Sequence, residues 1–265
     1  MHGGYPERIV CLTEETTETL YLLGEDTRIV GISGFTVRPP RARREKPKVS
    51  AFTSAKIDRI VALEPDLVLG FSDLQADIAA ELARAGIEVH LFNHRSVGEI
   101  LRTVRVLGGM IGCESKAAAL ADRLAANVER VRAAAAGLPR RPRVYFEEWD
   151  DPLITAIRWV GEIVEIAGGV NCFPELSANS LGRDRIIADP LEVVRRAPDM
   201  VLGSWCGKKF RPDRVAARPG WSEMPAVKSG ALHEIKSAII LQPGPAALTD
   251  GLEAIHALIR RWAQH

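Results

Sequence analysis

The chain lacks several features that would assign it to a class at once. Its 265 residues contain no apolar run of about 18 residues or more, so we expect no transmembrane helix and no membrane insertion. It has almost no charge imbalance, with 35 basic residues against 34 acidic ones. Nucleic-acid-binding proteins usually carry a basic excess or a basic stripe, so we expect no nucleic acid among the partners.

Cysteine is scarce and follows no pattern. The four cysteines form no CxxC motif and no short metal-binding spacing, which indicates free or buried thiols in a reducing compartment. The first residues show no basic start followed by an apolar stretch and a small-residue cleavage site. Both features favour a cytoplasmic location. A periplasmic or lipid-anchored location is the alternative if a leader has been removed.

Enzyme signatures are also missing. The sequence has no GxSxG, HExxH or P-loop motif, and no GxGxxG after a predicted strand. A cluster of acidic residues after one strand favours a solvated loop, and two histidines four residues apart are too few ligands for a metal. These residues are Glu147, Glu148, Asp150, Asp151, His90 and His94. We therefore expect a protein that is not an enzyme, with no catalytic residue, no metal site and no cofactor of its own.

An internal repeat is the main positive signal. Residues 59–71 (RIVALEPDLVLGF) and residues 192–204 (EVVRRAPDMVLGS) share a helical end, a Pro-Asp pair, an apolar run and a glycine. The proline ends the helix because it cannot donate a hydrogen bond, and the apolar run is typical of a buried strand. A second pair, residues 8–24 and 143–169, has the order strand, loop, helix and glycine in both copies. The repeat predicts two similar Rossmann-like α/β lobes with largely parallel sheets.

One long helix is predicted between the two copies. Ten of the 24 residues at 114–137 are alanine, the strongest helix former. An apolar stripe of Leu120, Leu124, Val128 and Val131 lies on one face of this helix. We therefore predict an N-terminal lobe at 1–113, a rigid bridging helix at 114–137 and a C-terminal lobe at 138–265.

The remaining elements follow from the same patterns. Further strands are predicted at 28–32, 66–70, 87–92, 199–204 and 232–235, with another near 239–242. Helices are predicted at 56–63, 75–85, 97–111, 188–197 and 246–263. The stretch 38–48 carries six basic residues among three prolines and is predicted to be a basic loop.

Candidate ligand contacts follow the ends of the predicted strands. Ligands of open α/β sheets bind beyond the carboxyl ends of the strands, and aromatic side chains beside cations suit a large, flat, partly charged ligand. Trp149 and Trp205 are equally compatible with contact to a ligand and with packing in the core. The candidate contacts are Phe35, Arg38, Phe71, His94, Trp149, Arg183, Arg185, Trp205, Lys208 and Gln242.

Several motifs together resemble a known family. They are the Thr17-Glu18 pair with the following Leu20–Gly24, the two Pro-Asp units, Trp221 with Ala226–Lys228, and Pro243-Gly244-Pro245. The chain resembles substrate-binding proteins of ABC importers for cobalamin, haem and iron–siderophores, and is most similar to the cobalamin-binding members. The resemblance implies the class III periplasmic-binding-protein fold, two lobes joined by one rigid helix with the ligand in the cleft between them.

The resemblance also implies a function. We expect non-catalytic binding of a corrinoid, cobalamin or cobinamide, or of a similar metal chelate, for an ABC importer or as a leaderless relative of such a component. An iron–siderophore or haem is the alternative ligand. A metal-dependent enzyme or metal-cluster protein on the related fold is the alternative of another class. The bound ligand would be a cobalt corrinoid or an iron chelate.

Two departures from the family pattern concern the site and the partner. Cobalamin-binding members stack a tryptophan on the corrin from the loop after the third strand, where this chain has Phe71. The acids that dock such proteins on a permease have their nearest counterparts in Asp77 and Glu192, each displaced by about one position. We expect a monomer that binds a small-molecule chelate, with an ABC permease as a candidate partner.

Overall fold

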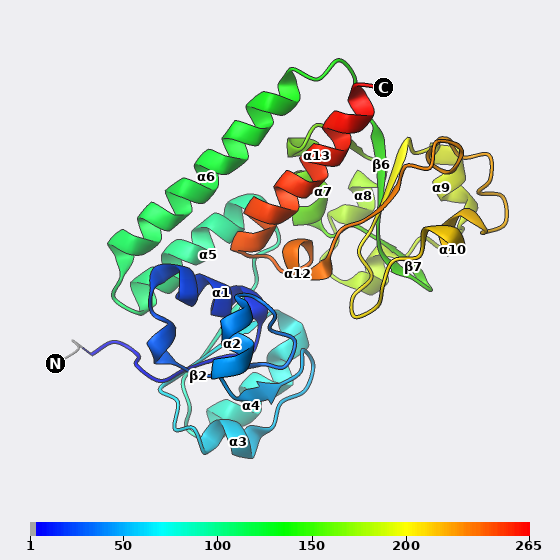
Figure 1. Cartoon of the computed structure of the whole chain (residues 1–265). Helices are drawn as coiled ribbons and strands as arrows, with labels where there is room; N and C mark the ends of the chain where they lie inside the picture. Colours follow the sequence, from blue (N-terminus) through cyan, green and yellow to red (C-terminus); the bar gives the residue numbers. More distant parts are fainter. Residues whose placement is uncertain (1–3) are drawn as a thin grey trace. The chain divides into compact units, whose positions relative to one another are not determined.

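The structure, a computed structural model, describes residues 4–265. The chain forms two compact units, one of the residues up to 94 together with 98–124, the other of residues 95–97 and 125–265. Each unit is built on its own five-stranded sheet, and Figure 1 labels the main elements. The two Pro-Asp repeats therefore belong to two separate sheets, as the repeat predicts.

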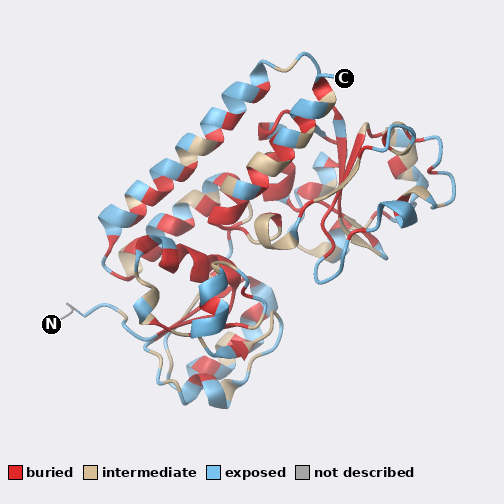
Figure 2. Cartoon of the chain, in the orientation of Figure 1, coloured by how far each residue is buried: buried red, intermediate tan, exposed pale blue. Residues whose placement is uncertain are grey.

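The sheet of the first unit has the order β3-β2-β1-β4-β5, and every neighbouring pair is parallel. Parallel strands covered on both faces consist of continuous apolar runs, and β1 and β4 are buried along their whole length. Figure 2 shows the buried residues concentrated in the strands and in the faces of the helices that cover them. The strands are β1 (Ile9–Cys11), β2 (Ile29–Ser33), β3 (Lys48–Ser50), β4 (Leu67–Phe71) and β5 (Val89–Phe92).

The helices of the first unit follow its strands in alternation. In α4 the buried residues Ile78 and Leu82 are four positions apart, so they lie on one face and pack into the core. Gly24, with φ 74°, ends α1, because this left-handed conformation is accessible to glycine at little cost. The helices are α1 (Glu14–Leu23), α2 (Pro40–Glu45), α3 (Ile57–Val61), α4 (Ala76–Arg84) and α5 (Val97–Met110).

The sheet of the second unit has the order β10-β9-β6-β7, and β8 also pairs with β6. All its pairs are parallel except β6 with β7, which form an antiparallel hairpin. The hairpin turns at Asp151 and Pro152, directly at the carboxyl end of β6. The strands are β6 (Arg143–Asp150), β7 (Leu153–Thr155), β8 (Val170–Asn171), β9 (Met200–Gly203) and β10 (Leu232–Glu234).

The second unit has more short helices than the first. The core around Tyr145, Phe173, Phe210 and Trp221 is aromatic. Trp159 of α7 is also buried, and its Nε1 donates to the carbonyl of Ile240 over 2.9 Å. A π-helical turn at Ala247–Gly251 leads into the last helix. The helices are α7 (Arg158–Ile166), α8 (Pro174–Ser177), α9 (Leu191–Arg196), α10 (Pro212–Ala216), α11 (Pro225–Lys228), α12 (Ser237–Ile240) and α13 (Leu252–Ala263).

Helix α6 (Glu114–Ala136) is continuous and belongs to both units, its residues up to 124 to the first and the rest to the second. The predicted stripe is buried, since Leu120, Leu124, Val128 and Val131 are at most 4% exposed. The predicted lobe limits at 113 and 138, and the role of α6 as a rigid bridge, stay predictions.

The Pro-Asp motif has the same structural role in both units. The Asp66 carboxylate accepts hydrogen bonds from the backbone N–H of Glu7 (2.7 Å) and Arg8 (2.9 Å), just before β1. The Asp199 carboxylate accepts one from the backbone N–H of Arg143 (2.8 Å), the first residue of β6. Asp66 lies just before β4 and thereby holds the start of β1, the strand with which β4 pairs. Asp199 lies just before β9 and in the same way holds the start of β6, with which β9 pairs.

Two predictions of local structure are wrong. The stretch near 239–242 is not a strand but the end of α12 and a turn, because a short apolar run has no periodicity that distinguishes a strand from a helix.

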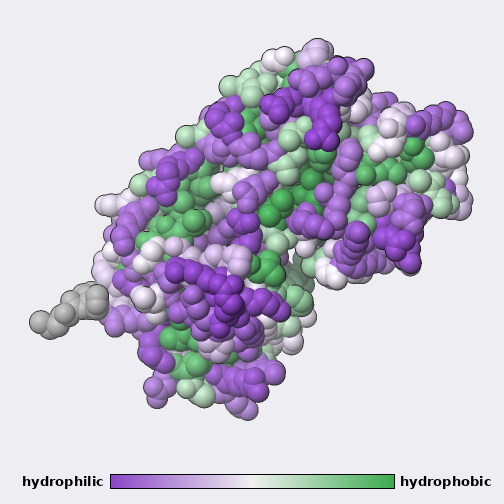
Figure 3. All heavy atoms as spheres, in the orientation of Figure 1, coloured by the Kyte–Doolittle hydropathy of each residue, from purple (hydrophilic) through white to green (hydrophobic). Residues whose placement is uncertain are grey.

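The basic stretch 38–48 is not only a loop, since it contains α2 and the start of β3. Pro40 is the first residue of α2, where a missing N–H costs nothing, and the fully buried Ala42 anchors the helix. The arginines of α2 give this part of the surface a strongly hydrophilic character (Figure 3).

The predicted fold class is confirmed: both units are α/β, with largely parallel sheets and with helices between successive strands except in the β6–β7 hairpin. Among the described residues, no helix combines the length and apolar character that crossing a membrane requires.

Candidate functional site

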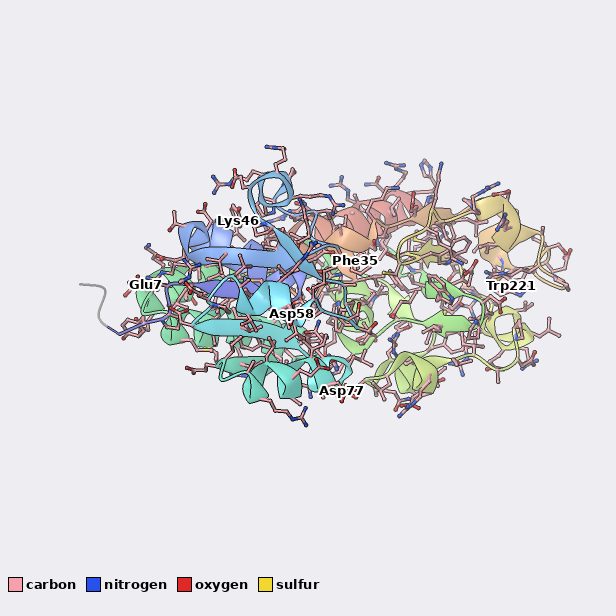
Figure 4. The ribbon with its side chains drawn as sticks, turned by 90° about the horizontal axis from the view of Figure 1, so that it is seen from below. Glu7, Phe35, Lys46, Asp58, Asp77 and Trp221 are labelled. Carbon is pink, nitrogen blue, oxygen red and sulfur yellow. The ribbon has the colours of Figure 1, made fainter. Side chains whose placement is uncertain are left out.

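The first unit presents an aromatic side chain and a cation after β2. Phe35 is 55% exposed, and Figure 4 labels it. The guanidinium of Arg38 is half-buried, and its Nε donates to the Glu18 carboxylate of α1 over 2.9 Å. Both residues follow the carboxyl end of a parallel strand, which is where ligands of open α/β sheets bind. Of the predicted contacts in this unit, Phe35 is the most accessible.

Two carboxyl groups are buried beside this edge, at the start of α1. Burial and, to a smaller extent, the neighbouring charge of Glu15 raise the pKa of Glu14 to about 8. Burial also raises the pKa of Glu15 to about 7, although the hydroxyl of Thr13, which donates to it over 2.6 Å, acts in the opposite direction. One Glu14 oxygen, Oε2, has no hydrogen-bond partner among the described residues. The sequence analysis does not identify these two carboxyl groups as part of a site. Two successive acidic residues shortly after a buried strand are the signal that could have revealed them.

Phe71 and His94 lie together but are shielded from solvent. Phe71 is 6% exposed and His94 is 1% exposed, and their rings meet edge to face with centroids 5.1 Å apart. His94 also contacts the ring of Phe92 in β5. These three rings come from the carboxyl ends of β4 and β5, which are paired strands. The predicted role of Phe71 and His94 in contacting a ligand stays a prediction.

In the second unit, Glu147 organises the carboxyl end of the sheet. Its fully buried carboxylate accepts hydrogen bonds from the Tyr145 hydroxyl (3.0 Å), the Trp205 Nε1 (3.0 Å) and both terminal nitrogens of Arg218 (2.6 and 2.8 Å). Burial alone would lower the pKa of Arg218, but the hydrogen bonds and the charge of Glu147 act in the opposite direction, and the pKa is raised overall. A charge this deeply buried is stable only when it is paired and hydrogen-bonded, and this network meets both conditions.

Lys208 lies next to this network and is accessible. Its ammonium group is 4.1 Å from the centroid of the half-buried Trp149 ring and 5.2 Å from that of Trp205. It also forms an ion pair with Asp150 at the end of β6. The structure thus brings three predicted contacts, Trp149, Trp205 and Lys208, together at one edge of the second sheet.

Two of the predicted contacts are placed in the core instead of on the surface. Trp205 is 3% exposed, and its ring packs edge to face on Phe210 at 5.0 Å. Arg185 is 2% exposed, and its guanidinium pairs with the Glu148 carboxylate at 2.6 and 3.0 Å. The Trp205 Nε1 donates to Glu147, and the terminal nitrogens of Arg185 bind Glu148, so these polar atoms have partners within the protein. The predicted role of Trp205 and Arg185 in contacting a ligand stays a prediction.

The other predicted residues are at least partly accessible. Arg183 is exposed in the turn Gly182–Arg185, and Gln242 is half-buried after α12. Asp77 is exposed in the first turn of α4, and Figure 4 labels it. Glu192, in the first turn of α9, forms ion pairs with Arg195 (2.8 Å) and Arg196 (2.9 Å), and hydrogen bonds from these arginines lower its pKa.

The acidic cluster of the second unit is a set of ion pairs. Glu147 pairs with Arg218, Glu148 with Arg185, and Asp150 with Lys208, so the prediction of a merely solvated loop is wrong for these three residues. Across residues 4–265, no group of three or more His, Cys, Asp or Glu side chains could hold a metal ion.

Comparison with known proteins relates these features to a family. A family model described as "Periplasmic binding protein" matches residues 9–239. An uncharacterized ABC transporter substrate-binding lipoprotein of Bacillus subtilis is 24% identical, covering 94% of this chain and 79% of its own length. A protein of Halobacterium salinarum named cobalamin-binding protein is 28% identical over 71% of this chain, and the match spans 53% of that protein.

Solved structures show the same fold. The apo form of a periplasmic heme-binding protein from Roseiflexus sp. RS-1 superposes with a TM-score of 0.85 and 22% identity, covering 97% of this chain and 99% of that one. At this identity the likeness concerns the fold alone.

Proposed function

Because the chain belongs to the periplasmic binding protein family, we propose that it binds a corrinoid or a similar metal chelate without transforming it and delivers it to an ABC importer. The relative named cobalamin-binding protein supports a corrinoid, cobalamin or cobinamide, as the ligand. The relative named an ABC transporter substrate-binding lipoprotein supports the importer role. Haem and ferric siderophores are the alternative ligands.

One observation carries the proposal: in each unit an aromatic residue and a cation lie near the carboxyl end of a strand of the sheet. These pairs are Phe35 with Arg38 in the first unit, and Trp149 with Lys208 in the second. A corrinoid or porphyrin has a broad apolar face and polar groups around its rim. The rings would contact the face, and the cations would pair with acidic or amide groups of the rim.

The proposed contacts differ in accessibility. Phe35, Arg38, Trp149, Lys208, Arg183 and Gln242 are at least partly exposed and are the proposed direct contacts. Phe71 and His94 are buried, and their role would be to shape the site under the exposed residues. Trp205 would act through Lys208, which lies over its ring.

The test is retention of ligand. The purified chain is mixed separately with cyanocobalamin, dicyanocobinamide, haemin and ferrichrome, and absorbance is measured after gel filtration. We expect one corrinoid per chain, recovered chemically unchanged. Retention of none of the four, or release of an altered product, would contradict the proposal, and retention of haemin or ferrichrome alone would assign the alternative ligand.

Two variants connect retention to the named side chains. Phe35→Ala and Trp149→Ala are each expected to weaken corrinoid binding, because each removes a stacking surface worth about 0.5–1.5 kcal/mol beyond its buried area. The controls are Val61→Ala in the first unit and Val170→Ala in the second, which shorten exposed apolar side chains outside these edges. Equal losses in variants and controls would remove the assignment of the site.

The family also bears on location and partners. The relatives favour a periplasmic or lipid-anchored protein over the cytoplasmic one that cysteine usage predicts, and we propose that location. Fractionation of native cells tests the location.

We further propose a monomer that binds an ABC permease through Asp77 and Glu192. Thiol-directed cross-linking of the variants Asp77→Cys and Glu192→Cys tests the contact with the permease.

A further inference from the structure

The first unit carries a cluster of cations on and after α2 that the proposed function does not use. We call it the α2 patch, and its members are Arg41, Arg43, Arg44, Lys46 and Lys48. Glu45 is the only acidic residue within the segment 41–48. Without these six residues, the 35 basic and 34 acidic residues of the chain reduce to 30 and 33. The positive charge of the chain is therefore concentrated in this segment, and the rest is slightly acidic.

Most of this charge is exposed and is not neutralised by neighbours. Lys46 is half-buried, and the other four cations are exposed. Arg41 pairs with Asp26 at 3.1 Å, and its guanidinium lies 4.6 Å from the centroid of the Tyr21 ring. The remaining cations of the patch form no ion pair with an acidic side chain among residues 4–265. The α2 patch is thus a source of positive potential at the surface.

The cations of the patch point in several directions. Arg41 and Arg44 are three positions apart in α2 and lie on one side of it, whereas Arg43 lies on another side. The Arg43 Nη1 donates to the carbonyl of Gly34 over 2.7 Å, which fixes its direction without neutralising its charge. Figure 4 labels Lys46 and shows nitrogen-ended side chains projecting outward from this part of the first unit. Because these cations diverge, they suit a broad anionic surface better than a single small anion.

From these features we propose that the α2 patch binds the anionic surface of a lipid membrane, peripherally and without spanning it. Lipid headgroups are mobile, so their phosphates can reach cations that point in different directions. Val37, an exposed apolar residue shortly before α2, suits the boundary between headgroups and acyl chains. An acidic protein would instead have to match each divergent cation with a fixed carboxylate. The proposal does not depend on the proposed function, because it involves no chelate.

The test is co-sedimentation of the full chain with lipid vesicles in the absence of any chelate. One set of vesicles contains equal parts of phosphatidylcholine and phosphatidylglycerol, and the other contains phosphatidylcholine alone. We expect binding to the anionic vesicles at low salt, and a decrease towards physiological salt, where charges are screened over about 8 Å. No binding to the anionic vesicles at low salt, or equal binding to both sets, would overturn the proposal.

A matched pair of double variants locates the contact. Arg44→Gln with Lys48→Gln removes two exposed cations of the patch that form no ion pair among the described residues. This change should weaken binding to the anionic vesicles by about twenty-fold, which is about five-fold for each cation. Arg84→Gln with Arg102→Gln makes the same change of net charge on α4 and α5, near β4 and β5 at the other end of the sheet. This control should stay within about two-fold of the parent chain, and equal losses in both double variants would overturn the proposal.

Two further measurements separate charge from structure, and lipid from protein. Arg44→Lys with Lys48→Arg keeps both charges and should bind the anionic vesicles as the parent chain does. If this variant binds as weakly as the glutamine variant, the loss reflects the structure of the segment and the proposal is overturned. Poly-L-glutamate is the probe for an acidic protein partner and should bind more weakly than the anionic vesicles at the same salt concentration. Stronger binding of poly-L-glutamate than of the vesicles would assign the α2 patch to an acidic protein and overturn the lipid proposal.

Discussion

Glu147 and Arg218 form a two-hydrogen-bond ion pair in which the carboxylate is fully buried and the guanidinium side chain is 17% exposed. The pair joins the carboxyl end of β6 to the loop before Trp221, and the Trp205 Nε1 and the Tyr145 hydroxyl donate to the same carboxylate. A buried pair of this kind is costly to break, because the remaining charge keeps no equivalent partner.

The first prediction concerns this pair. Glu147→Gln should lower the free energy of unfolding by about 3 kcal/mol, measured by urea denaturation, because it leaves the Arg218 charge unbalanced. The control is Asp213→Asn, since Asp213 and Arg211 form a two-hydrogen-bond pair on the surface. An exposed pair is worth about 0–1 kcal/mol, so equal losses in both variants would show that burial of Glu147 has no energetic consequence.

The second prediction concerns the aspartates of the repeat. Asp66→Ala should destabilise the protein by about 2 kcal/mol, because two backbone N–H groups lose a charged acceptor. Asp199→Ala removes one such bond and should cost less, about 1 kcal/mol. Asp66→Asn and Asp199→Asn keep an acceptor oxygen and should recover part of each loss in urea denaturation. If the asparagine variants are as unstable as the alanine variants, the hydrogen bonds do not explain the motif.

The third prediction concerns pH. The pKa of Glu14 is raised by burial from 4.5 to about 8 in the folded state, so the folded protein binds more protons than the unfolded chain between these values. The contribution of Glu14 to the free energy of unfolding should therefore be fully present below about pH 4.5, and should fall as the pH rises towards about 8. Glu14→Gln, which remains uncharged, should reduce this fall in urea denaturation at pH 5 and pH 8. An unchanged pH dependence in the variant would mean that Glu14 is ionised in the folded protein.

The fourth prediction concerns Trp205. Because its side chain packs in the core, Trp205→Ala should lower the free energy of unfolding by about 3–5 kcal/mol. At a temperature where the variant is folded, its corrinoid affinity should stay close to that of the parent chain. Melting temperature and ligand affinity are compared in the same preparation. A stable variant with strongly weakened binding would instead identify Trp205 as a direct ligand contact.

The sequence predicts the architecture well for a physical reason. The apolar runs of β1 and β4, the stripe of α6 and the Pro-Asp repeats are local patterns, and parallel sheets need such runs in alternation with helices. The site is less predictable, because its details depend on partners distant in sequence. Trp205 is buried through Glu147, 58 positions away, and Arg185 through Glu148, 37 positions away. No local pattern reveals such pairings.

The last prediction concerns Lys208, which is exposed and contacts the Asp150 carboxylate and the face of Trp149. A cation in this position attracts a chelate with carboxylate side groups, such as haem, more than it attracts an uncharged corrinamide. Lys208→Ala should therefore weaken haemin binding by at most about five-fold, with a smaller effect on dicyanocobinamide. The effect should decrease between low and physiological salt, because exposed charges are screened over about 8–10 Å. Lys209→Ala is the matched control, since this neighbouring exposed lysine is not a predicted contact. Titration of both variants at two salt concentrations is the measurement. A loss independent of salt, or the same loss in the control, would assign Lys208 to the packing of its loop instead of to the ligand.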